Sequence, residues 1–94
     1  MHERALIADV THKVEQMAVL DGAERVTRVQ VRLGALSHFT PEHFREHFDE
    51  AARGTLAAGA EVVATLDPDI SAPYAADVVL ESIEVELPDE AGTR

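Results

Sequence analysis

The segment from Val26 to Leu33 alternates between apolar and polar side chains, and this pattern constrains the fold more than any other feature of the chain. One set of alternate positions holds Thr27, Val29, Val31 and Leu33, and the other holds Arg28, Gln30 and Arg32. Successive side chains of a strand point to opposite faces of a sheet. The alternation therefore predicts a half-buried strand with an apolar face toward a core and a charged face outward.

An amphipathic helix is predicted before this strand, over residues 3–20. Apolar side chains recur there at helical spacing, whereas charged residues lie off the stripe. The stripe consists of Leu6, Val10, Val14 and Met17, widened by Ile7 and Ala18. Asp21 and Gly22 end the helix, because glycine tolerates the left-handed turn that follows a helix end.

A second helix is predicted to begin near Pro41, and its start is well specified. Thr40 is a suitable N-cap and proline is favoured at the first helical position. Phe39 can close over Phe44 as a hydrophobic staple. The apolar stripe of this helix is formed by Phe44, Phe48, Ala51 and Ala52, and Gly54 ends it.

Two further strands are expected, at residues 61–66 and 78–87, joined by a loop at residues 67–77 with two prolines. In the last strand, Val79, Ile83, Val85 and Leu87 share one face, and Ser82, Glu84 and Glu86 share the other. The order α-β-α-β-β predicts an α+β fold with two helices packed on one face of a small mixed three-stranded sheet. Residues 88–94 are expected to form a frayed tail.

The charged faces of the first and last strands are complementary, with Arg28 and Arg32 on one and Glu84 and Glu86 on the other. Opposite charges on facing strands are mildly stabilising. We therefore expect the first strand to lie at the centre of the sheet, beside the last one.

Composition excludes several classes of function. The 94 residues allow one small domain, and the absence of cysteine excludes thiolate metal sites, iron–sulfur clusters and a cysteine nucleophile. A net charge of −10 disfavours binding to nucleic acid or to anionic membranes. No run of apolar residues is long enough for a membrane span, so a cytoplasmic protein is predicted.

The chain opens with Met1, His2 and Glu3, whose donor atoms can chelate a metal ion. The terminal amine, the imidazole and backbone nitrogen of His2, and the backbone nitrogen of Glu3 can close a square plane, which suits Ni(II) and Cu(II). The amine must lose its proton, and its reference pKa is about 7.7 to 8.0, so binding should weaken as pH falls. Taken alone, however, the pattern favours an exposed amino end that binds nothing.

The remaining histidines give weaker signals. His43 and His47 are four residues apart on the second predicted helix and could share a metal, but no third ligand is in register with them. They are therefore interpreted as the edge of a solvated face. His12 and His38 are interpreted as surface or boundary residues, although His38 could reach a metal held at the amino end.

Catalysis finds no support in the sequence. Ser37, Ser71 and Ser82 have no glycine-flanked elbow, and no glycine-rich loop could cradle a phosphate. A chain of this size also has little room for a deep substrate pocket. The protein is predicted not to be an enzyme.

Six short motifs carry a family resemblance. They are Met1-His2-Glu3, VTRVQVRLGALS from Val26 to Ser37, PEHFREHF from Pro41 to Phe48, Gly54-Thr55, GAEV from Gly59, and SIEVE from Ser82 to Glu86. Together and in this order they resemble the HypA/HybF family of hydrogenase nickel-incorporation proteins. The similarity runs from Met1 to about Leu66 and resumes near Val79.

The resemblance implies that residues 1–87 form a single HypA-like domain of a cytoplasmic nickel metallochaperone. It implies Ni(II) binding by the amine of Met1, by the imidazole and backbone nitrogen of His2, and by the backbone nitrogen of Glu3, whose carboxylate is a further candidate donor. The ion would pass, with a nickel-handling partner GTPase, to the large subunit of a nickel–iron hydrogenase. Some members of the family also serve urease maturation.

The chain departs from the family in one large respect. The family inserts a zinc domain with two Cys-x-x-Cys pairs between the second and last strands, where this chain has the loop at residues 67–77. No structural zinc is therefore expected. One alternative is a HypA-like protein-interaction adaptor with an acidic C-terminal half and an idle Met-His-Glu segment. Another is a structural domain that forms a homo-oligomer by pairing exposed strand edges.

Overall fold

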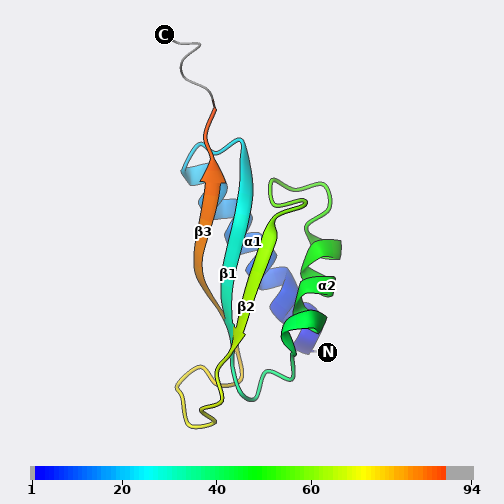
Figure 1. Ribbon diagram of the computed structural model, residues 1–94, viewed down its shortest axis with the longest axis vertical. Helices are drawn as coiled ribbons and strands as arrows, with labels where there is room; N and C mark the ends of the chain where they lie inside the picture. The colour runs from blue at the N-terminus through cyan, green and yellow to red at the C-terminus, as the bar shows by residue number, and fades with distance from the viewer. Residues whose placement is uncertain (1, 89–94) are drawn as a thin grey trace.

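The computed structural model describes residues 2–88, which form two helices and three strands (Figure 1). The elements in chain order are α1 (His2–Leu20), β1 (Arg25–Leu33), α2 (Pro41–Ala51), β2 (Glu61–Leu66) and β3 (Val78–Glu86). The predicted α+β class and element order are confirmed. No helix within residues 2–88 has the combination of length and apolar character that crossing a bilayer requires.

The three strands form one mixed sheet in the order β2-β1-β3, so β1 is central, as predicted. β1 runs parallel to β2 and antiparallel to β3. Val29 of β1 pairs with Val62 on one side and with Ile83 on the other. A parallel pair needs a crossover connection, and α2 supplies it between β1 and β2.

Both helices bury side chains against this sheet in one core. Figure 1 shows α1 crossing behind the sheet and α2 lying beside β2. The core residues of the helices are Ile7, Val10, Val14 and Ala18 from α1 and Phe44 and Phe48 from α2. Met17, predicted to lie on the buried stripe of α1, is 38% exposed instead. The stripe is therefore centred on Ile7 and Ala18 rather than on Leu6 and Met17.

Two irregularities in the pairing of β1 with β3 change which residues face the core. One lies between Val26 and Arg28, and it breaks the alternation so that Val26 is buried and Thr27 is only half-buried. The prediction that Thr27 shares the buried face is wrong, because a bulge shifts side chains by one position.

The second irregularity has the same effect in β3. It lies between Gln30 and Val31, which pair with Ser82 and Leu80 and leave Glu81 as the extra residue. Val78 and Leu80 therefore pack on the core in place of Val79, contrary to the prediction.

Ion pairs cover the outer face of the sheet, in a different combination from the predicted one. Arg28 lies 3.4 Å from Glu84, as expected, and 3.2 Å from Glu61 of β2. Arg32 instead contacts Glu81, at 2.8 Å. Glu86 pairs at 2.6 Å with Arg25, because the antiparallel register places these two residues opposite one another.

The segment at residues 67–77 connects β2 to β3 without helix or strand, as predicted. Its end is attached to the turn after β1, where the backbone N–H of Gly34 donates to the carbonyl of Asp77 at 2.9 Å. The N–H of Leu36 donates to the carbonyl of Ala75 at 2.8 Å. Most of the predicted frayed tail, residues 89–94, lies outside the described residues.

Candidate metal site

The start of α2 is fixed by the residues that the sequence singled out. Thr40 has extended backbone angles, and its side chain accepts a hydrogen bond from the N–H of His43 at 3.1 Å. Pro41 is the first helical residue. The rings of Phe39 and Phe44 meet edge to face with centroids 5.5 Å apart. The predicted N-cap and staple are both confirmed.

The buried face of α2 orients two histidines. Phe44 and Phe48 are fully buried and anchor that face in the core. His43 and His47 each precede one of these phenylalanines, so they lie at the edge of the packed face and are partly exposed. Their rings stack with centroids 4.5 Å apart and planes at 19°. The ring of Phe39 packs edge to face on His43.

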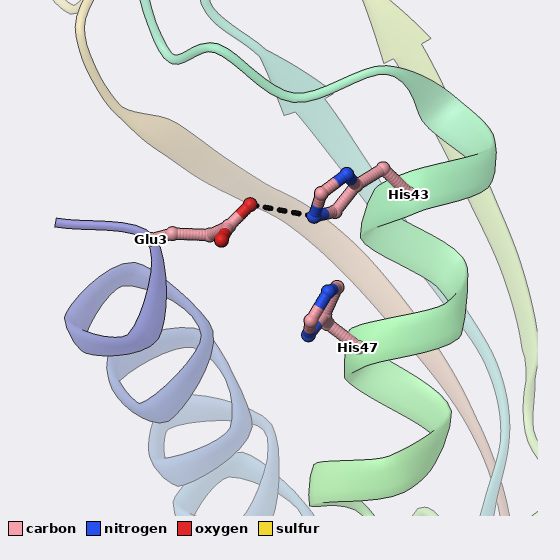
Figure 2. Close-up of side chains that lie close together, drawn as sticks. All are labelled: Glu3, His43 and His47. Carbon is pink, nitrogen blue, oxygen red and sulfur yellow. Dashed lines mark ion pairs between the residues drawn. The ribbon is translucent and has the colours of Figure 1, made fainter. Parts of the chain in front are cut away.

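The side chain of Glu3 reaches this pair from the other helix. Glu3 lies one turn before Ile7, which is buried, so both residues occupy the face of α1 that packs toward α2. Figure 2 shows Glu3 pointing from the first turn of α1 toward His43, with His47 one turn further along α2. The Glu3 carboxylate lies 2.5 Å from Nε2 of His43.

Glu3, His43 and His47 therefore bring one carboxylate and two imidazoles together. Each offers one donor atom, and these three atoms all lie within 4.8 Å of one another. Two imidazoles and a carboxylate are ligands that zinc, nickel, cobalt and iron(II) accept. The three side chains can thus present donor atoms to one divalent transition ion.

The Nε2 atom of His43 has an unusual environment within the described part of the chain. It is buried, and no described residue makes a hydrogen bond to it, despite the short distance to Glu3. The two atoms form an ion pair when the imidazole carries a proton. A buried polar atom needs a partner, which the Glu3 carboxylate supplies through a shared proton or through a shared metal ion.

Other residues of the sequence-based site lie elsewhere. Met1 and the side chain of His2 are outside the part of the chain that the structure describes. His12 and His38 are both exposed. His38 has a φ of 68°, a left-handed conformation that histidine adopts at some cost, in the turn before α2. Among the described residues, neither belongs to a group of potential metal ligands.

The role of Glu3 as a partner of His43 and His47 was missed in the sequence. The interpretation of these histidines as the edge of a solvated face rested on the lack of a third ligand in register, and the structure supplies that residue from α1. One signal was present: Glu3 stands four residues before Ile7, on the side of the helix that carries the apolar stripe. This signal predicts a third ligand only when it is also known that the start of α1 packs beside α2.

Comparison with known proteins identifies the family to which this chain belongs. The family model described as "Hydrogenase/urease nickel incorporation, metallochaperone, hypA" matches residues 1–71, more than half of the chain. The chain belongs to the HypA family. The family's description is of a metallochaperone rather than an enzyme, in agreement with the expectation from the sequence.

Curated HypA proteins and a HybF protein are similar to this chain over about two thirds of its length or more. Hydrogenase maturation factor HypA of Methylocella silvestris is 44% identical over 70 residues, which are 74% of this chain and 58% of that protein. The HypA of Chlorobium limicola is 40% identical over 62 residues, 66% of this chain and 53% of that protein. HybF of Salmonella typhimurium is 40% identical over 62 residues, 66% of this chain and 55% of that protein. These matches span about half the length of the curated relatives.

Two solved HypA structures share the fold. The solution structure of the Ni metallochaperone HypA from Helicobacter pylori has a TM-score of 0.73 at 15% identity, and the match covers 92% of this chain and 98% of that one. A second HypA solution structure has a TM-score of 0.63 at 16% identity and covers 90% of this chain and 96% of that one. At these identities the likeness concerns the HypA fold alone.

Proposed function

We propose that this chain is a nickel-binding metallochaperone that assists the maturation of a nickel enzyme, the large subunit of a nickel–iron hydrogenase. The observation that carries the proposal is the match of residues 1–71 to a family described by nickel incorporation. That stretch includes Met1, His2 and Glu3, the residues with which we expect the chain to bind Ni(II). The names of the curated relatives, hydrogenase maturation factors, support the choice of client.

The position of these residues at the start of a helix supports the same proposal. The first backbone N–H groups of a helix have no acceptor within it, and α1 begins at His2. The amide nitrogens of His2 and Glu3 can therefore lose their protons to a metal without the loss of a helical hydrogen bond. Because those nitrogens then become anionic, they offset the positive end of the helix dipole, which otherwise disfavours a cation.

The proposal extends to partners and to the loop at residues 67–77. A nickel-handling GTPase and the hydrogenase large subunit are the partners that delivery requires, and the cytoplasm is the expected location. The loop stands, in this proposal, where the family carries its zinc domain, so that residues 1–87 act as one nickel-binding domain. With no cysteine in the 94 residues, a thiolate zinc site has no ligands.

Titration of Ni(II) into untagged protein tests the nickel site. We expect a yellow, diamagnetic species with four nitrogen ligands, and weaker binding as pH falls because the amine must lose its proton. His2→Ala and acetylation of the amino end should each abolish this species. His12→Ala is the matched control, since it removes an exposed imidazole from the same helix and should change nothing.

A different result would favour the adaptor. If His2→Ala binds nickel as the unmodified chain does, or if only octahedral, oxygen-rich coordination forms, the delivery role is refuted. The Met-His-Glu segment would then be idle, and the acidic C-terminal half would remain as a surface for a partner protein.

A further inference from the structure

We propose that Glu3, His43 and His47 form a second metal site, which binds a divalent transition ion of the zinc class between α1 and α2. This site uses side chains alone. It needs neither the terminal amine nor the imidazole of His2, so it does not rest on the proposed delivery of nickel.

The geometry of the three side chains carries the proposal. Their donor atoms lie within 4.8 Å of one another, and two of them, on Glu3 and His43, are 2.5 Å apart. Ligand atoms around one tetrahedral zinc ion are about 3.3 Å apart for bond lengths near 2.0 to 2.1 Å. A tetrahedral ion therefore requires the Glu3 and His43 atoms to separate by about 0.8 Å and the widest pair to close from at most 4.8 Å, changes on the scale of side-chain rotation.

The orientation of His43 is the second observation. Its buried Nε2 receives no hydrogen bond from the described residues, although a carboxylate oxygen lies beside it. Figure 2 shows the carboxylate aimed at His43 itself, so the two atoms can share either a proton or a metal ion. A metal ion bound by both atoms would receive a lone pair from each and take the place of that proton.

The charges around the three side chains, together with the types of ligand, favour some divalent ions over others. Glu3 and His43 both lie in the first turn of a helix, where the dipole disfavours a cation. The Glu3 carboxylate opposes this effect, and Glu50 lines the groove beside Glu3 and His47 together with Arg4. With one carboxylate in the set, the bond energy must come from the imidazoles, which favour zinc, nickel and cobalt over magnesium and calcium.

Three protein ligands leave at least one coordination position open. Closed structural sites use four protein ligands, whereas three-ligand sites bind water or another group in the fourth position. The partial exposure of all three side chains gives that position access to solvent. The site is therefore suited to an ion that exchanges rather than to a permanent structural ion.

The test uses the full chain with its amino end acetylated, so that the square-planar chelate cannot form. Zn²⁺ is titrated by calorimetry, and Co²⁺ is added as a visible-absorption probe of coordination. We expect one ion per chain, with affinity lowered at least tenfold in each of His43→Ala, His47→Ala and Glu3→Gln. His12→Ala should bind as the parent does.

The helix content and the urea midpoint of each variant show whether the fold is retained. If the alanine variants are unstable, His43→Gln and His47→Gln replace them as the test variants. If His43→Ala binds Zn²⁺ as tightly as His12→Ala, the side-chain site is refuted. The yellow nickel species of the unmodified chain should persist when His43 and His47 are both replaced. The two proposals can therefore fail independently.

Discussion

Oγ1 of Thr40 accepts a hydrogen bond from the backbone N–H of His43 at 3.1 Å. This bond closes the first turn of α2 and sets the direction in which the His43 side chain leaves the helix. Since the same histidine lies 2.5 Å from Glu3, the cap of one helix helps to define its contact with the other. Local helix chemistry and the geometry of the candidate metal site are thus coupled through one residue.

Removal of the cap should destabilise the protein. Thr40→Ala leaves the N–H of His43 without its acceptor, and we expect the free energy of unfolding to fall by about 1 kcal/mol. Thr40→Ser keeps the acceptor and should lower the free energy of unfolding by only a few tenths of this amount. Urea denaturation measures the difference, and equal stability of the two variants would show that the cap contributes nothing.

Two glycines should respond differently to the same substitutions. At Gly34 a Cβ would overlap the backbone carbonyls of Ala75 and Tyr74, so Gly34→Ala must displace the end of the loop and should cost about 1 to 3 kcal/mol or more. At Gly22 the φ is +67° with open space around it, so Gly22→Ala should cost about 1 to 2 kcal/mol from backbone strain alone.

Asparagine separates the two mechanisms, because it tolerates the left-handed conformation but is larger than alanine. Gly22→Asn should be more stable than Gly22→Ala, whereas Gly34→Asn should be less stable than Gly34→Ala. Urea denaturation of the four variants provides the comparison. A gain in stability from alanine to asparagine at Gly34 would contradict the steric explanation.

The loop at residues 67–77 contains a carboxylate with a shifted pKa. The side chain of Ser71 donates to the Asp69 carboxylate at 2.7 Å and its backbone N–H does so at 2.9 Å, and these bonds lower the pKa of Asp69. The stabilisation is present above the unfolded pKa of about 3.9 and is lost as pH falls through the lower folded value.

Ser71→Ala removes the larger of the two contributions, so the pKa of Asp69 should rise toward its ordinary value. A carboxyl-carbon NMR titration measures this shift directly. Ser82→Ala is the control, because Ser82 donates to Gln30 on β1 and is not a partner of Asp69. An unchanged Asp69 titration in Ser71→Ala would exclude the hydroxyl as its cause.

The elements of this fold were predictable because their signals are local. Thr40, Pro41 and the two phenylalanines around them specify the start of α2 within six residues of sequence. The complementary charges of Arg28 and Glu84 correctly placed β3 beside β1, since opposite charges on neighbouring strands attract. Periodicity also gave the approximate bounds of both helices and all three strands.

Pairing between strands decided details that no local pattern contains. The bulges of the β1–β3 pair buried Val26 instead of Thr27 and placed Glu86 beside Arg25. A bulge depends on how two distant segments fit together, so alternation within one strand cannot reveal it.

The candidate side-chain site most clearly separates what the sequence determines locally from what tertiary packing determines. The sequence by itself determined that His43 and His47 share one edge of a helix and that Glu3 lies in the first turn of another. Only the packing of α1 against α2 brought the carboxylate to the imidazoles, because the relative position of two helices follows from the whole buried core. Spacing along the chain determines which side chains share an element, and tertiary packing determines which elements meet.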